Sequence, residues 1–276
     1  MQQRIDSHQH FWKYDPQAHS WIDETMHKIR RDFLPEDLQP LLQENHFSGC
    51  VAVQADQTEE ETKFLLGLAH SHSFIKGVVG WVDLLNNKVA ERLHYFSGEE
   101  KLKGFRHVVQ GEPAGFMLRN DFKNGIGALK DFGYTYDILI YHHQLPDAIK
   151  LATLFPDQPF VIDHIAKPDI KTGDIKKWED GIKELARLEN VLCKVSGMVT
   201  EADWDKWTPD DLKPCLDVVF ENFTSNRIMF GSDWPVCNVA ASYGTVVHTL
   251  EKYMLQLSGN DRELVWYKNA QAFYNL

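Results

Sequence analysis

The chain of 276 residues lacks the segments that would place it in a membrane or send it for secretion. It contains no run of about 18 apolar residues, and its first residues carry no apolar segment of the signal-peptide type. Positive charge is also in deficit, since 29 Lys and Arg stand against 40 Asp and Glu for a net charge of −11. This balance disfavours nucleic acids and anionic membranes as partners. We therefore expect a cytoplasmic protein.

Cysteine is scarce, and several catalytic motifs are missing. The four cysteines form no CxxC pair, which excludes a zinc ribbon and a thioredoxin-type redox motif and predicts free, buried thiols. No GxSxG elbow is present, so a serine-type α/β-hydrolase has no nucleophile. No P-loop or glycine-rich dinucleotide fingerprint follows a strand, so we expect no nucleotide cofactor.

What the chain does contain is a regular alternation of strand and helix patterns. Strands that alternate with helices imply a parallel sheet, and eight such units favour a closed (β/α)8 barrel over an open sheet. We expect one domain over residues 1–276, with the segment Glu112–Gly127 overhanging the barrel top and Asp261–Leu276 closing the ring. The expected helices between strands include Glu59–Ser71, Gln144–Leu154, Trp178–Leu188 and Pro209–Phe223, and the expected strands are Arg4–His10, Gly49–Gln54, Gly77–Val82, Lys103–Val108, Thr135–Ile140, Pro159–His164, Val191–Ser196 and Arg227–Gly231.

Polar side chains gather at the ends of these strands, where barrel enzymes carry their catalytic groups. Residues two apart on a strand point to the same face, so His8 and His10 both face the barrel interior and can share a metal or line one pocket. Buried charge without a partner costs several kcal/mol, so this accumulation indicates a site rather than ordinary packing. The other polar residues at strand ends are Arg106, His107, Tyr141, His142, His143, Asp163, His164, Lys167, Lys194, Ser196 and Asp233.

The combination resembles the amidohydrolase superfamily, whose pattern is HxH after the first strand, His after a middle strand and Asp after the eighth. More narrowly, it is similar to the amidohydrolase-2 branch, which holds hydrolases of fucono- and rhamnonolactones and of 2-pyrone-4,6-dicarboxylate. The resemblance extends over nearly the whole chain in the order of the family. It is carried by residues 6–12, 53–55, 61–62, 104–107, 163–168, 194–197 and 230–235.

The resemblance implies hydrolysis of a small-molecule lactone, with Asp233 as the base that takes the water proton and returns it to the leaving hydroxyl. His8, His10 and His164 are the other catalytic candidates. A dicarboxylate would need several arginines, and Arg106 alone ends a strand, so a neutral sugar lactone is favoured. The candidate substrate contacts are Arg106, His107, Trp12, Tyr141, His142, Lys167, Lys194 and Trp234.

No lysine ends the fourth strand, so a binuclear centre with a carboxylated lysine is not expected. The resemblance implies at most one divalent ion on His8, His10 and Asp233, with His164 or His142 nearby. Zinc suits these ligands, and metal-independent activity stays open beside it.

Purely structural roles also remain open for several of these candidates. Asp233 can be a helix N-cap, Lys194 a buried ion-pair partner, and the aromatic candidates core packing. Two rival functions stay open, namely a metal-dependent decarboxylase or other amidohydrolase on the same barrel, and a barrel that binds sugar or metal without turnover. Monomer and homodimer are equally compatible with the sequence.

Overall fold

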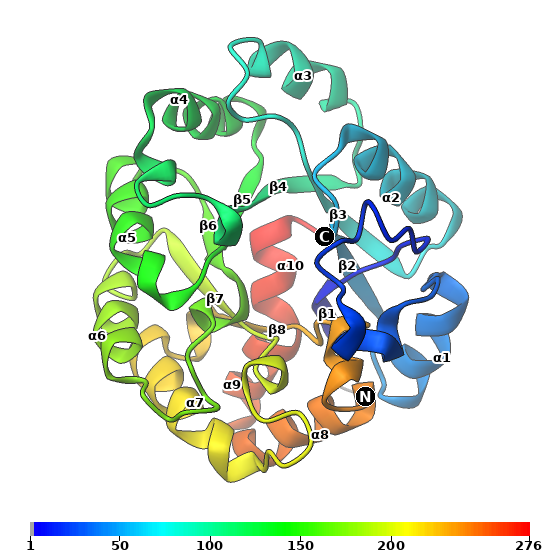
Figure 1. Cartoon of the computed structure of the whole chain (residues 1–276), viewed down its shortest axis with the longest axis vertical. Helices are drawn as coiled ribbons and strands as arrows, with labels where there is room; N and C mark the ends of the chain where they lie inside the picture. Colours follow the sequence, from blue (N-terminus) through cyan, green and yellow to red (C-terminus); the bar gives the residue numbers. More distant parts are fainter. Residues whose placement is uncertain (1–2) are drawn as a thin grey trace.

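Eight parallel strands form the centre of the structure, a computed structural model that describes residues 3–276 (Figure 1). Each strand pairs with the next one along the chain, so the order is β1 to β8 without a crossover. The predicted (β/α)8 barrel is therefore confirmed. The strands are β1 (Ile5–Gln9), β2 (Gly49–Val53), β3 (Ile75–Gly80), β4 (Leu102–Val108), β5 (Thr135–Leu139), β6 (Phe160–Ile162), β7 (Val191–Val195) and β8 (Ile228–Phe230).

Helices surround this sheet, and local sequence explains where they begin. The side chain of Thr58 accepts a hydrogen bond from the backbone N–H of Glu61, which caps the first turn of α2. Among residues 3–276, no helix combines the length and apolarity needed to cross a bilayer. The helices are α1 (Pro35–Glu44), α2 (Glu59–Ser71), α3 (Val89–Phe96), α4 (Asn120–Leu129), α5 (Leu145–Leu154), α6 (Lys176–Leu185), α7 (Pro209–Phe223), α8 (Tyr243–Met254), α9 (Gly259–Glu263) and α10 (Asn269–Tyr274).

The C-terminal segment does not close the ring, which corrects the expectation for Asp261–Leu276. The helix that follows β8 is α8, whose buried Tyr243, Val247, Leu250 and Met254 recur at helical spacing. Beyond it, α10 lies at the centre of the ring in the view of Figure 1. The buried side chains of α10 pack against strand residues in one apolar cluster. This cluster includes Ile5, Val51, Val79, Val161, Met229, Ala270 and Tyr274.

The ends of the sheet meet through backbone hydrogen bonds between β1 and the segment that follows β8. The N–H of Asp233 donates to the carbonyl of His8 at 2.9 Å, and the N–H of His10 donates to the carbonyl of Trp234 at 2.7 Å. The hydroxyl of Ser7 adds a bond to the carbonyl of Phe230 at 2.6 Å. The segment after β8 is therefore joined to β1, and this seam closes the barrel.

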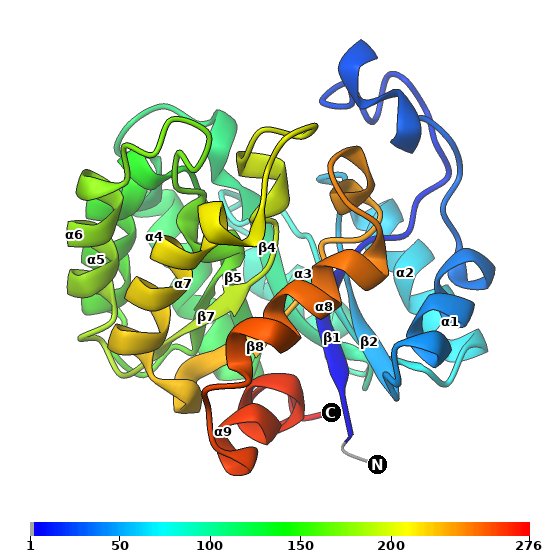
Figure 2. The same ribbon diagram turned by 90° about the horizontal axis from the view of Figure 1, so that it is seen from below.

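The segment that projects over the barrel mouth follows β1, not β4. Figure 2 shows the chain between β1 and α1 rising beyond the carboxyl ends of the strands. It contains a 3₁₀ helix, Glu24–Ile29, and Lys28 of that helix donates to the carbonyl of Val239 at 3.1 Å. The region Glu112–Gly127, expected to overhang, holds a 3₁₀ turn at Phe116–Leu118 and most of α4, which belongs to the outer ring.

Two helical glycines provide a matched test of this packing. A Cβ on Gly125 of α4 would collide with the carbonyl oxygen of Leu84, whereas a Cβ on the exposed Gly67 of α2 would meet nothing within 4 Å. We expect Gly125→Ala to lower the free energy of unfolding by about 1–3 kcal/mol through overpacking. Gly67→Ala should raise it by about 0.5–1 kcal/mol through helix propensity. Urea unfolding followed by circular dichroism measures both, and equal effects would contradict the packing described for α4.

Candidate active site

A cavity of about 410 Å³ opens at the carboxyl ends of the strands. Its lining residues lie at the carboxyl ends of seven strands or in the loops that follow them, and only β3 contributes none. Six of the predicted site residues line it, namely His10, Arg106, Tyr141, His164, Lys167 and Asp233. The mouth of the barrel is therefore where the chemistry predicted from the sequence converges.

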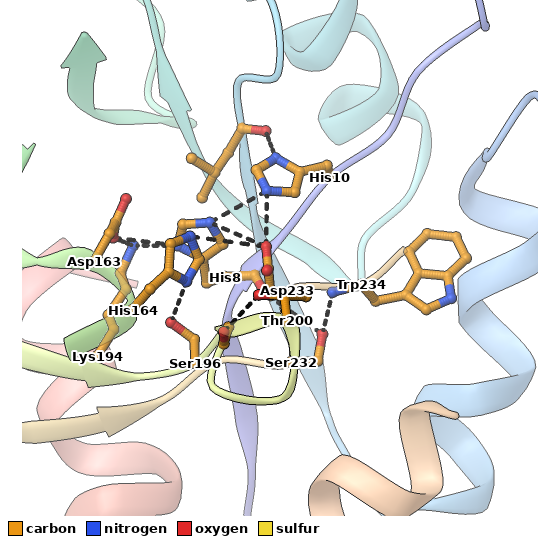
Figure 3. A network of polar contacts seen from close by, with 12 residues as sticks. His8, His10, Asp163, His164, Lys194, Ser196, Thr200, Ser232, Asp233 and Trp234 are labelled. Carbon is orange, nitrogen blue, oxygen red and sulfur yellow. Dashed lines mark hydrogen bonds and ion pairs between the residues drawn. The ribbon is translucent and has the colours of Figure 1, made fainter. Parts of the chain in front are cut away.

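His8, His10 and Asp233 present their polar atoms to one point (Figure 3). The Nε2 atoms of the two histidines are 3.3 Å apart, and Asp233 Oδ1 lies 3.3 Å from His10 Nε2 and 3.9 Å from His8 Nε2. His10 Nδ1 lies 2.8 Å from the carbonyl of Val53, which can only accept, so a neutral His10 presents a lone pair at Nε2. Acceptors facing one another at this spacing require a proton or a cation between them.

This donor set fits one divalent ion. Ligand atoms held tetrahedrally at about 2.0–2.2 Å from zinc lie roughly 3.3–3.6 Å from one another. Two of the three separations here are 3.3 Å, and the third, between His8 Nε2 and Asp233 Oδ1, is 3.9 Å. Arg106 Nη1 also lies close to this set, 3.2 Å from His8 Nε2. A second set, His8, Asp163 and His164, is also close enough to hold an ion. However, the ammonium of Lys194 already lies between its members, 3.1 Å from His8 Nδ1 and 3.0 Å from Asp163 Oδ1.

Beneath this set lies a buried layer of compensating charge. Lys194 Nζ is 2.5 Å from Asp137 Oδ2, and Arg106 Nη1 is 3.1 Å from Asp163 Oδ2. Burial raises the pKa of Asp163, but Lys194 and His8 outweigh burial and hold that pKa well below its usual range. Asp163 is therefore an ionised anchor for both cations. Isolated, these buried charges would each cost several kcal/mol, so their pairing is a condition for the fold.

The shifts in pKa leave Asp233 ionised and therefore able to accept a proton. Burial alone would raise the pKa of Asp233, but the contacts with His164 and His10 outweigh it and place the pKa below its ordinary value. Burial lowers the pKa of His8 and of His164 well below the ordinary histidine value. At neutral pH an ionised carboxylate thus lies beside two neutral imidazoles.

His164 enters the cavity through a left-handed turn after β6. Four consecutive residues have positive φ, with values of 52°, 48°, 60° and 47° from His164 to Lys167. The N–H of Lys167 donates to the carbonyl of His164 at 2.8 Å, and the indole of Trp178 donates to the carbonyl of Ile165 at 2.5 Å. Gly197 makes room for the imidazole, because a Cβ there would lie 2.5 Å from His164 Nδ1. The first and last residues of the turn therefore both line the cavity.

The structure places five other predicted substrate contacts away from the cavity wall. His107 follows Arg106 on β4 and points to the opposite face, where its Nε2 lies 2.9 Å from Glu112 Oε1. Trp12 and Trp234 are buried and pack edge to face on Phe33. The others are His142, whose Nδ1 lies 3.1 Å from the carbonyl of Lys167, and Lys194, which is held in the charged layer.

Several residues of the site had no functional role predicted from the sequence. Asp163 had a visible signal, since a carboxylate directly precedes His164 at a strand end. Trp21 and Met26 reach the cavity from the segment after β1, and no periodic pattern marks them. Thr200, Glu201 and Trp204 come from the loop after β7. Irregular loops have no repeat from which the direction of a side chain could be predicted.

The chain is similar to known proteins along nearly its whole length. A family model described as amidohydrolase, Amidohydro_2, matches residues 5–276. A relative from Burkholderia multivorans named L-fucono-1,5-lactonase is 40% identical over 285 residues, covering 99% of this chain and 96% of the relative. A protein of Scheffersomyces stipitis named L-rhamnono-gamma-lactonase is 24% identical over 225 residues, covering 72% of this chain and 65% of its own. A crystal structure of an amidohydrolase from Burkholderia multivorans with bound zinc superposes with a TM-score of 0.95, at 40% identity and 99% coverage of each chain.

The donor geometry generates a test of metal binding. We expect the purified protein to take up one zinc ion per chain, and His10→Ala to weaken zinc binding by at least about tenfold, because it removes one of three ligands. Elemental analysis after dialysis and calorimetric titration measure the stoichiometry and the affinity. His248→Ala is the control, since its side chain is 63% exposed on α8. Equal zinc affinity in the two variants would show that the ion does not bind at His10.

Proposed function

The chain belongs to the amidohydrolase family, and on that premise we propose that it is a lactonase that hydrolyses a sugar-derived lactone to the open aldonic acid. More specifically, we propose a six-membered 1,5-lactone as the substrate, because the relatives that are 40% and 35% identical are both named L-fucono-1,5-lactonase. One observation carries the mechanism. A buried, ionised Asp233 lies at the cavity wall, 3.3 Å from His10 and 3.8 Å from His164.

Asp233 moves the proton in this mechanism. The contacts with all three histidines are to Oδ1, which leaves Oδ2 to exchange a proton with water. As the water oxygen bonds to the lactone carbonyl carbon, Asp233 takes one of its protons and a tetrahedral alkoxide forms. The bond to the ring oxygen then breaks, and Asp233 returns the proton to that oxygen as it leaves. The products are a carboxylic acid and a free hydroxyl on one open chain.

Arg106 supplies positive charge for the alkoxide. Its guanidinium is almost fully buried, lines the cavity, and is oriented by Asp163 and by the carbonyl of Gln54. A fixed cation stabilises developing negative charge best where water is excluded, because the local dielectric is low. His164, whose Nδ1 lies 2.9 Å from Ser196 Oγ, keeps its Nε2 directed toward Asp233.

A divalent ion would be held by His8, His10 and Asp233. When bound, it would polarise the lactone carbonyl and lower the pKa of water. The proton transfer at Asp233 and the charge of Arg106 are contributions of the chain itself.

The charges around the cavity support a neutral substrate. Arg106 is paired with Asp163, and Lys167 Nζ lies 3.1 Å from Glu201 Oε1. A dicarboxylate would need cations without such partners, arranged to bind each carboxylate. A polyhydroxylated lactone instead needs both hydrogen-bond donors and hydrogen-bond acceptors. The cavity lining provides both, for example in Lys167 and Glu201.

Replacement of Asp233 tests the mechanism. We expect Asp233→Asn to lower kcat on L-fucono-1,5-lactone roughly a thousandfold, because the amide cannot accept the water proton. Proton release recorded with a pH indicator gives the rate, and the melting temperature checks the fold. Asp157→Asn, which removes a surface carboxylate paired with Lys130, is the control and should keep its activity. Undiminished turnover in a folded Asp233→Asn protein would refute the assignment of the base.

A further inference from the structure

We propose that Lys167 and Glu201 form the subsite that recognises the ring hydroxyls of the lactone, and so decide which lactones are good substrates. The inference rests on the proposed lactonase function and deepens it. Both side chains line the cavity that contains Asp233. They are 18% and 20% exposed, so they remain open to a ligand while most of each is shielded from water.

The two residues come from different loops and meet inside the cavity. Lys167 ends the left-handed turn after β6, and Glu201 ends a 3₁₀ turn, Val199–Glu201, after β7. Their charged atoms are 3.1 Å apart. The backbone also joins the loops, since the N–H of Lys171 donates to the carbonyl of Glu201 at 3.0 Å. The ion pair therefore has a fixed place relative to His164 and Asp233.

The backbone strain around Lys167 indicates a functional role. Left-handed conformation is unfavourable for an L-residue and most of all for a β-branched one, and the turn includes Ile165 with φ of 48°. Strain of this kind persists where its surroundings impose it, and it concentrates at ligand sites. A partly exposed ion pair stabilises a fold only weakly, which is too little to account for four consecutive left-handed residues. What the turn achieves is to place Lys167 in the same cavity as His164.

The chemistry of the pair matches adjacent hydroxyl groups. A carboxylate accepts hydrogen bonds from two hydroxyls, an ammonium donates up to three, and each sugar hydroxyl can do both. Because the two charges cancel, the pair binds a neutral diol without attracting anions. Tyr141 lies beside it, with its ring centroid 5.8 Å from Lys167 Nζ, and offers a flat surface for the apolar face of the ring. A lactone without hydroxyls would leave the charged pair desolvated and uncompensated.

The test measures discrimination between two six-membered lactones. L-fucono-1,5-lactone carries ring hydroxyls and a methyl group, and δ-hexalactone is the same methyl-substituted ring without the hydroxyls. The readout is the ratio of kcat/KM for the first to kcat/KM for the second. We expect Glu201→Gln to lower this ratio about 10- to 100-fold, mainly through a higher KM for the hydroxylated lactone, since a hydrogen bond to a charged group is worth about 1.5–3 kcal/mol.

Lys167→Met provides a second variant in case Glu201→Gln unfolds, and the same fall in the ratio is expected for it. Asp157→Asn on the surface should keep the wild-type ratio. A ratio within twofold of wild type in a folded Glu201→Gln or Lys167→Met protein would overturn the subsite, because both lactones would then depend on the pair equally. A wild-type protein inactive on every lactone would instead refute the proposed function itself, so the two failures are distinguishable.

Discussion

The active site depends on the seam at which the barrel closes. Two backbone hydrogen bonds join β1 to the chain after β8, one from Asp233 to His8 and one from His10 to Trp234. The same four residues include the two histidines and the carboxylate of the candidate metal set. Closing the barrel and assembling the site are therefore one event. Asp6 reinforces the seam, because its carboxylate accepts a hydrogen bond from the N–H of Ser232 at 2.9 Å.

The charged layer below the seam explains how a barrel interior tolerates catalytic groups. Lys194 and Arg106 are opposed by Asp137 and Asp163, so the layer is nearly neutral, although all four side chains are almost fully buried. For His8, the opposing effects of Asp163 and Lys194 on its pKa are smaller than that of burial, which lowers it. Tyr274 of α10 donates to Asp137 at 2.8 Å and links the layer to the apolar floor. Catalytic chemistry is thus confined to the upper part of the barrel, and packing dominates the lower part.

Much of the fold was predictable because most of the strands are short, largely apolar runs that alternate with helix-like stretches. Each of the eight strands begins and ends within two residues of its predicted bounds, and α2 and α7 begin and end as predicted. The helix α8 was not predicted, and the place expected for Asp261–Leu276 was wrong, since an amphipathic stripe shows that a helix buries one face but not which surface receives it. The long segment after β1 offered no periodicity, and its position over the mouth follows from tertiary contacts such as that of Lys28 with Val239.

For the site, the sequence by itself determined which residue types end which strands. HxH on β1 and Asp233 after β8 followed from that, because side-chain alternation along a strand is local geometry. Tertiary structure alone decided which candidates share the cavity. It turned His107 outward, withdrew Lys194 into an ion pair with Asp137, and brought Glu201 to Lys167. The physical reason is that loop conformation and charge pairing arise between segments far apart in the chain, and no local pattern records them.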